Sequence, residues 1–271
     1  MQRLIIILIM FWLNITTALS NEMGITDING ELKMANKLNI TYWSDYACPY
    51  CYIAEKRLEQ VLDKMGLNKD VTIKMKAFEL NPEAPKDVTS TTLERFAIKY
   101  GLSKEDAQKQ IDHISELGQN EGIDFKYATT LYTNTFDAHR LTKFAEAQGN
   151  SELAQKVIKL LFDAYFTQNL KLADENVLLN VAEKVGLNAE DVKKMLVSDE
   201  YKYDVRTDEQ EAYANGVHAV PFFIINEKYA LPGALSKDAM EQMINKAITE
   251  QAQNAEEEIA PSCGPEGCVL R

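Results

Sequence analysis

Hydrophobic and polar residues recur with two different periods along this 271-residue chain. Two short segments rich in β-branched and aromatic residues, 38–43 and 71–78, predict strands. Between them, the apolar residues of 49–65 recur at helical spacing, with Pro49 suited to the first turn and Gly66 to the end. This order predicts a β-α-β unit with parallel strands.

From about residue 83 to residue 203 the apolar residues follow helical spacing almost throughout. Three of these stripes begin after a polar residue that favours a helix N-terminus: Ser103, Asp174 and Asn188. The strand pattern returns at 222–225 and 229–231, and a last helix is expected after Ser236.

These patterns predict an α/β protein in which an all-helical segment interrupts a small sheet domain. The sheet domain is expected to comprise residues 38–82 and 204–250, with the inserted helical domain at 83–203. The remaining divisions are a leader at 1–20, a linker at 21–37 and a flexible tail at 251–271.

The first twenty residues differ from the rest of the chain. Arg3 precedes an apolar run at 4–13, and Ala18-Leu19-Ser20 offers small residues for cleavage. The arrangement is typical of a secretory signal peptide, and the run is too short for a stable membrane span. It predicts a periplasmic or secreted protein, where disulfides persist. The alternative is an upstream start codon, with the true start at Met23 or Met34 and a cytoplasmic protein.

Composition narrows the function classes. The net charge is −12 and no cluster of Lys and Arg is found, so we expect no nucleic-acid partner. The four cysteines form two close pairs, Cys48/Cys51 and Cys263/Cys268. Such pairs indicate redox chemistry or a metal site rather than a small fold held together by scattered disulfides.

Cys48-Pro49-Tyr50-Cys51 lies where the first predicted strand meets the helix. Disulfide exchange needs a thiolate, an accessible sulfur and a second thiol nearby. The unpaired N–H groups and the dipole of a helix N-terminus favour a thiolate at Cys48, and Cys51 follows one turn later. We therefore expect Cys48 to be the nucleophile and Cys51 to be the resolving thiol.

The alternative for this motif is half of a zinc site, completed by Cys263 and Cys268. It is disfavoured because no further Cys or His lies near the motif to complete four ligands. We expect neither a metal nor an organic cofactor. Cys263/Cys268 is a candidate second redox pair that exchanges electrons with Cys48/Cys51, while an inert disulfide or two free thiols fit the spacing equally well.

Val220-Pro221 directly precedes the apolar strand at 222–225. Proline has no N–H for a strand ladder, so it suits the start of a strand. In the predicted order this loop lies beside the dithiol, and a cis bond there would leave backbone groups free to pair with an extended substrate. Val220, Pro221, Pro49 and Tyr50 are therefore the predicted substrate-binding residues.

The chain resembles the DsbA-like branch of the thioredoxin superfamily, and within it the FrnE-type oxidoreductases. The segments that carry the resemblance, between about 38 and 250, are Asp45–Ile53, Phe78–Pro82, Ala138–Leu141, Leu161–Phe166 and Gly216–Phe223. It implies a thioredoxin-like fold with a helical domain inserted after the second strand. By matching position, it implies that Cys48 attacks, Cys51 resolves and Pro221 is a cis-proline. The leader is a departure from many members of this group.

The same branch includes glutathione-dependent isomerases and kappa-type glutathione transferases, in which the attacking position resembles a serine. The presence of both cysteines favours the oxidoreductases. Glu79 is a candidate proton relay for Cys51, although a solvated carboxylate at a strand end is favoured. His139 and Arg140 are candidates either for contacting substrate or glutathione or for supporting their helix.

We therefore predict a protein thiol–disulfide oxidoreductase. Its expected partners are substrate proteins with cysteines and a redox recycling partner, with glutathione as a further candidate. A non-catalytic alternative is a thioredoxin-fold chaperone or binding module that uses the helical domain as its surface.

Overall fold

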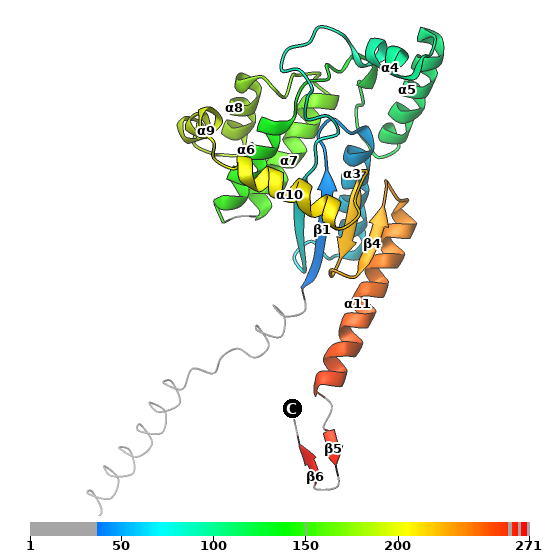
Figure 1. Cartoon of the computed structure of the whole chain (residues 1–271). Coiled ribbons are helices and arrows are strands. Elements are labelled where there is room, and N and C mark those ends of the chain that lie inside the picture. Colours follow the sequence, from blue (N-terminus) through cyan, green and yellow to red (C-terminus); the bar gives the residue numbers. More distant parts are fainter. Residues whose placement is uncertain (1–36, 150, 260–261, 265–266, 270–271) are drawn as a thin grey trace, which may run out of the picture. The chain divides into compact units, whose positions relative to one another are not determined.

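The computed structural model describes residues 37–149, 151–259, 262–264 and 267–269 (Figure 1). The predicted leader at 1–20 and nearly all of the linker lie outside these ranges. Within the described residues, no helix is both long and apolar enough for a membrane crossing. The signal peptide therefore stays a prediction.

The sheet has four strands in the order β2-β1-β3-β4. The strands are β1 (Leu38–Ser44), β2 (Val71–Ala77), β3 (Phe222–Ile225) and β4 (Tyr229–Pro232). β1 and β2 are parallel, and β3 is antiparallel to both β1 and β4. Helix α3 (Pro49–Met65) connects the parallel pair. The predicted β-α-β unit and the later hairpin are both confirmed.

Helices fill the chain between β2 and β3 (Figure 1). They are α4 (Thr92–Tyr100), α5 (Lys104–Gln119), α6 (Phe136–Ala147), α7 (Ser151–Phe166), α8 (Glu175–Lys184), α9 (Ala189–Val197) and α10 (Lys202–Ala214), with a short 3-10 turn η1 (Tyr127–Thr129). The three predicted caps, Ser103, Asp174 and Asn188, each accept a backbone N–H at the start of a helix.

Successive residues of β1 enter clusters on opposite faces of the sheet. Tyr42 belongs to the large core that the sheet shares with α3 and with Phe162 of α7, whereas Trp43 packs with Phe78 and with Ala212 of α10. The large core continues from the sheet into the inserted helices, and the chain from Leu38 onward forms one compact unit. The predicted boundaries of a separate helical domain therefore stay a prediction.

The C-terminal segment differs from the predicted flexible tail. α11 (Lys237–Ile259) continues past residue 250, because 251–258 is rich in Ala, Gln and Glu, which are strong helix formers. Beyond it, β5 (Ser262–Gly264) and β6 (Gly267–Val269) pair antiparallel, with Cys263 opposite Cys268.

Candidate active site

The dithiol motif occupies the first turn of α3. Cys48 is the N-cap residue and has an extended backbone, and Pro49 is the first residue of the helix. The carbonyl of Cys48 accepts the N–H of Cys51 at 3.1 Å, and Asp45 closes the preceding turn by accepting the N–H of Cys48 at 3.0 Å and that of Ala47 at 3.1 Å. The strand–turn–helix sequence thus places Cys48 at the positive end of the helix dipole, as predicted.

The Cys48 thiol contacts a loop that is distant in the sequence. Its Sγ donates to the carbonyl oxygen of Val220 at 3.6 Å, and the Val220–Pro221 bond is cis. The predicted proximity of this loop is therefore confirmed. The expectation of free backbone groups is wrong for two carbonyls: Val220 accepts from Cys48, and Pro221 accepts the N–H of Gly233 at 2.8 Å because the β3–β4 pairing continues past β3.

The two cysteines differ in their surroundings. Cys48 is only 4% exposed but lines a cavity, whereas Cys51 is 1% exposed and lies in the core. Burial raises the pKa of the Cys51 thiol well above its ordinary value, and the neighbouring Cys48 raises it further. Cys51 is thus a protonated thiol until a base takes its proton, which suits the second of two successive attacks.

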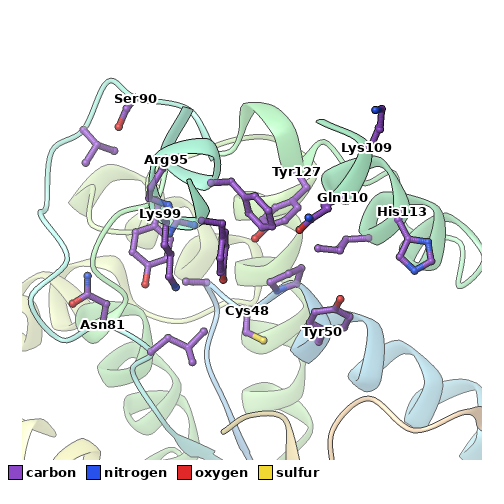
Figure 2. Close-up of a pocket in the computed structure, with 18 of the residues that line it drawn as sticks. Cys48, Tyr50, Asn81, Ser90, Arg95, Lys99, Lys109, Gln110, His113 and Tyr127 are labelled. Carbon is purple, nitrogen blue, oxygen red and sulfur yellow. The ribbon is translucent and has the colours of Figure 1, made fainter. Parts of the chain in front are cut away.

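A cavity of about 1070 Å³ opens beside Cys48 (Figure 2). Pro49 and Tyr50 border it on the dithiol side, and Tyr50 is 41% exposed. Side chains of α4 and α5, together with Tyr127 and Tyr132, form the other walls. The structure thus brings Cys48, Pro49 and Tyr50 to one cavity, while Val220 reaches the Cys48 sulfur itself.

Glu79 is buried, so the favoured prediction of a solvated strand-end carboxylate is wrong. Its side chain accepts from Arg206 at 2.7 Å and from Asn134 at 3.2 Å. Burial raises its pKa, while His139 and Arg206 lower it. Both partners are distant in the sequence, since Arg206 belongs to α10 and Asn134 precedes α6, and their hydrogen bonds hold the carboxylate. Its role as a proton relay stays a prediction.

His139 and Arg140 are both buried in α6 and do not line the cavity beside Cys48. The Arg140 guanidinium donates hydrogen bonds to backbone carbonyls around the C-terminal end of α9. Its Nη2 donates to the carbonyl of Met195 and, at 2.8 Å, to that of Ser198. It therefore satisfies carbonyls that a helix end leaves unpaired. His139 stacks against Tyr46 with ring centroids 4.9 Å apart. Its Nε2 also lies 3.6 Å from Asp45 Oδ1, so hydrogen bonds to a helix end account for Arg140, while ring packing and the nearby Asp45 carboxylate account for the buried position of His139.

Glu55 is a buried acid that the sequence reasoning missed. Neither carboxylate oxygen has a hydrogen-bond partner among the described residues, and burial raises its pKa to about 8. It borders a second cavity of about 350 Å³, together with Tyr42 and Lys159. The signal was present: Glu55 lies four residues after Cys51 on the buried stripe of α3, where an apolar residue is expected.

Within the described part of the chain, no three His, Cys, Asp or Glu side chains come close enough together to hold a metal ion. Cys263 and Cys268 are register partners in the β5–β6 hairpin. Their exchange of electrons with Cys48/Cys51 stays a prediction.

A parallel β-α-β unit with a dithiol at the helix start, a cis-proline loop against the thiol and helices inserted after β2 is the arrangement of a DsbA-like thioredoxin domain, the fold of a thiol oxidoreductase family. Residues 39–245 match the model of the DSBA-like thioredoxin domain family, and the chain belongs to this family.

Three proteins are similar to this chain over most of its length. A probable DsbA oxidoreductase from Streptomyces coelicolor is 29% identical, with a TM-score of 0.73 over 86% of this chain and 99% of that chain. The uncharacterized protein YwbO of Bacillus subtilis is 26% identical over 216 residues, which cover 77% of this chain and 96% of YwbO. The ClpXP adapter protein SpxH of Bacillus subtilis is 24% identical over 229 residues, covering 81% of this chain and 70% of SpxH.

Proposed function

We propose that this protein exchanges disulfides with substrate proteins through Cys48 and Cys51. The observation that carries the proposal is the placement of two unlike thiols in one helical turn. Cys48 lies at the helix start, at a cavity wall and against the Val220 carbonyl, and Cys51 lies in the core one turn later.

The reaction has two steps. The Cys48 thiolate attacks one sulfur of a substrate disulfide, so a Cys48–substrate disulfide forms and the first substrate thiolate leaves. Cys51 then gives up its proton and attacks the Cys48 sulfur, which releases the second substrate thiolate and forms the Cys48–Cys51 disulfide. The enzyme dithiol is oxidised and the substrate disulfide is reduced to two thiols. The reverse sequence oxidises a substrate dithiol.

The contact with Val220 supplies a binding role for the loop. When Cys48 loses its proton, the Val220 carbonyl loses its donor. It can then accept an N–H from a substrate chain that lies beside the sulfur. Tyr50 is exposed at the same cavity and offers an aromatic surface to that chain.

The proton of Cys51 needs an acceptor, and we assign that role to Glu55 rather than Glu79. Residues four apart on a helix have Cβ atoms about 5–6 Å apart, so a bridging water or a change of side-chain rotamer can connect the Glu55 carboxyl, which has no hydrogen-bond partner among the described residues, to Cys51. Glu55 has no competing hydrogen bond among the described residues, whereas Glu79 is held by Arg206 and Asn134. The Glu55 cavity, which Lys159 also borders, gives the proton a route outward.

Substitution of the two cysteines tests the exchange. Cys48→Ser should reduce both insulin reduction and oxidation of reduced ribonuclease to background, and Cys51→Ser should trap mixed disulfides with clients. A Cys263→Ser/Cys268→Ser double variant measures the contribution of the second pair in the same assays: unchanged rates confine the exchange to Cys48 and Cys51, and lower rates support electron exchange between the two pairs. Retained activity of Cys48→Ser in both assays would refute the assignment.

The similarity to the adapter SpxH supports a second candidate, a binding module that recognises clients without exchange. It predicts that client binding or protection against aggregation survives when Cys48 and Cys51 are both replaced. Loss of that protection together with the thiols would contradict it.

We also propose export from the cytoplasm, on the strength of the predicted leader at 1–20. Expression of the full chain, fractionation and N-terminal sequencing check this: a mature protein that begins near residue 21 supports export, and an intact leader in the cytoplasm contradicts it.

A further inference from the structure

The cavity beside Cys48 has a charge opposite to that of the whole chain. The chain carries a net charge of −12, yet no Asp or Glu is found among the described residues that line this cavity. Its walls instead include Arg95, Lys99 and Lys109, with His113 at the same wall as Lys109. A cationic cavity in an acidic protein concentrates anions near the nucleophile.

Two of these cations lack a carboxylate partner. Neither Arg95 nor Lys99 forms an ion pair with any described residue. Lys109 does, since its Nζ lies 3.0 Å from Asp106 Oδ1, and Figure 2 shows its side chain pointing outward. The charge that faces Cys48 therefore comes from Arg95 and Lys99, which lie one turn apart on α4.

The surroundings of Arg95 prepare it for a ligand. Its guanidinium lies 3.9 Å from the centre of the Tyr132 ring, and its Nε is buried with no hydrogen-bond partner among the described residues. A buried donor without a partner is costly, so an incoming acceptor gains more here than at an exposed site. Burial raises the pKa of Tyr132 to about 12, which leaves its hydroxyl protonated.

The position and size of the cavity limit the occupant. In Figure 2, Cys48 and Tyr50 lie on one side and Arg95, Lys99 and Tyr127 on the other, so a ligand between them meets both the sulfur and the cations. A volume of about 1070 Å³ slightly exceeds the roughly 300–1,000 Å³ that small-molecule sites typically span, so the cavity has room for both halves of a small disulfide. The lining residues come from the dithiol turn, the 80–90 segment, α4, α5 and the segment of Tyr127 and Tyr132, so a small ligand in the cavity meets side chains from several elements at once.

We propose that this cavity binds low-molecular-weight disulfides that carry carboxylates, with Arg95 and Lys99 holding the carboxylates while Cys48 attacks the disulfide. The inference rests on the proposed exchange function and names a substrate class for it. The Cys48 thiolate forms a disulfide with one half of the ligand, the other half leaves as a thiolate, and Cys51 then displaces the first half. The enzyme dithiol is oxidised as the ligand is reduced to two thiols.

Single-turnover oxidation of the pre-reduced full-length chain tests this. The probes are oxidised glutathione, which is anionic, 2-hydroxyethyl disulfide, which is neutral, and cystamine, which is cationic. We expect the anionic disulfide to react faster than its intrinsic reactivity with a free thiol predicts, and added NaCl to remove that advantage.

Arg95→Gln and Lys99→Gln should each slow the reaction with oxidised glutathione about tenfold at low salt, which corresponds to about 1.4 kcal/mol. The reaction with the neutral disulfide should stay within about twofold, and it reports that the variant is folded. Lys69→Gln is the matched control, because Lys69 is exposed beyond the far end of α3, about 25 Å along the helix. Lys99→Glu should invert the preference toward cystamine.

The outcomes separate the two proposals. If the reduced protein reacts with none of the three disulfides, the exchange function itself fails. If it reacts with all three in proportion to their intrinsic reactivity, or if Arg95→Gln and Lys99→Gln slow the neutral and anionic probes equally, the substrate class is wrong and the exchange function stands. Preference for an acidic peptide disulfide without preference for oxidised glutathione would also overturn the small-molecule assignment.

Discussion

Two cavities border helix α3, and their unpaired charges have opposite sign. At the cavity beside Cys48, at the start of the helix, Arg95 and Lys99 have no carboxylate partner among the residues that the structure describes. The cavity along its side leaves the carboxylate of Glu55 without a hydrogen-bond partner among the described residues, one turn after Cys51. Each thiol therefore has its own electrostatic surroundings.

The difference corresponds to the two steps of exchange. The first step brings a ligand from outside to Cys48, and unpaired cations at an open cavity serve binding. The second step moves a proton from a buried thiol, and an unpaired carboxyl with a pKa of about 8 serves proton transfer near neutral pH. Glu79, by contrast, is a buried acid whose carboxylate is already paired with Arg206.

The largest expected effect is on stability in Glu55→Gln. The pKa of Glu55 rises from about 4.5 unfolded to about 8 folded, so the folded state binds the proton more tightly. The stabilisation from protonated Glu55 is complete below about pH 4.5 and lost as pH rises through 8. The glutamine variant has no such loss, so the difference in free energy of unfolding between variant and wild type should move in favour of the variant by roughly 4–5 kcal/mol between pH 4.5 and pH 9.

Urea unfolding of both proteins at several pH values between 4.5 and 9 measures this difference. Glu79→Gln is the control. Because Arg206 pairs with the Glu79 carboxylate, the difference in free energy of unfolding between this variant and the wild type should depend much less on pH. If the free energies of unfolding of Glu55→Gln and the wild type change with pH by the same amount, Glu55 is not an unpaired buried acid.

The next effect is kinetic. Glu55→Gln should slow the resolution of a preformed Cys48–substrate mixed disulfide about 30-fold near pH 8, because Cys51 loses its proton acceptor. The first step, which Cys48 performs, should change little. Rapid-quench measurement of mixed-disulfide decay against pH checks this: the wild-type rate should rise through about pH 8 and the variant should lack that rise. Equal pH profiles would sink the proton-transfer role.

The smallest effect concerns Tyr42, which borders the Glu55 cavity and whose buried hydroxyl has no hydrogen-bond partner in the described part of the chain. Tyr42→Phe removes a polar atom that gains nothing from folding and should stabilise the protein by about 1 kcal/mol. Thermal unfolding at constant pH measures it. A loss of stability would show that the hydroxyl has a partner, such as an ordered water shared with Glu55.

Much of the active-site turn was predictable because it is local. Pro49 suits only the start of a helix, Gly66 ends it, and the strand before Cys48 follows from β-branched and aromatic residues over a few positions. The Val220-Pro221 loop was placed beside the dithiol by the order of elements. The extension of α11 to Ile259 was missed although its residues favour a helix.

The charged residues were harder, because their roles depend on partners distant in the sequence. Glu79 was expected to be solvated, yet Arg206, 127 residues later, reaches it. Arg95 and Lys99 have no sequence feature that points to Cys48; the packing of α4 and α5 over the start of α3 creates that relation.

The sequence by itself thus determined that the two thiols lie at the helix start, three residues apart, since neighbouring residues set where the helix begins. The tertiary structure alone decided which charges face them. Desolvation and pairing depend on every element packed around a site, so the unpaired carboxyl of Glu55, the paired one of Glu79 and the cations near Cys48 became distinguishable only in the folded chain.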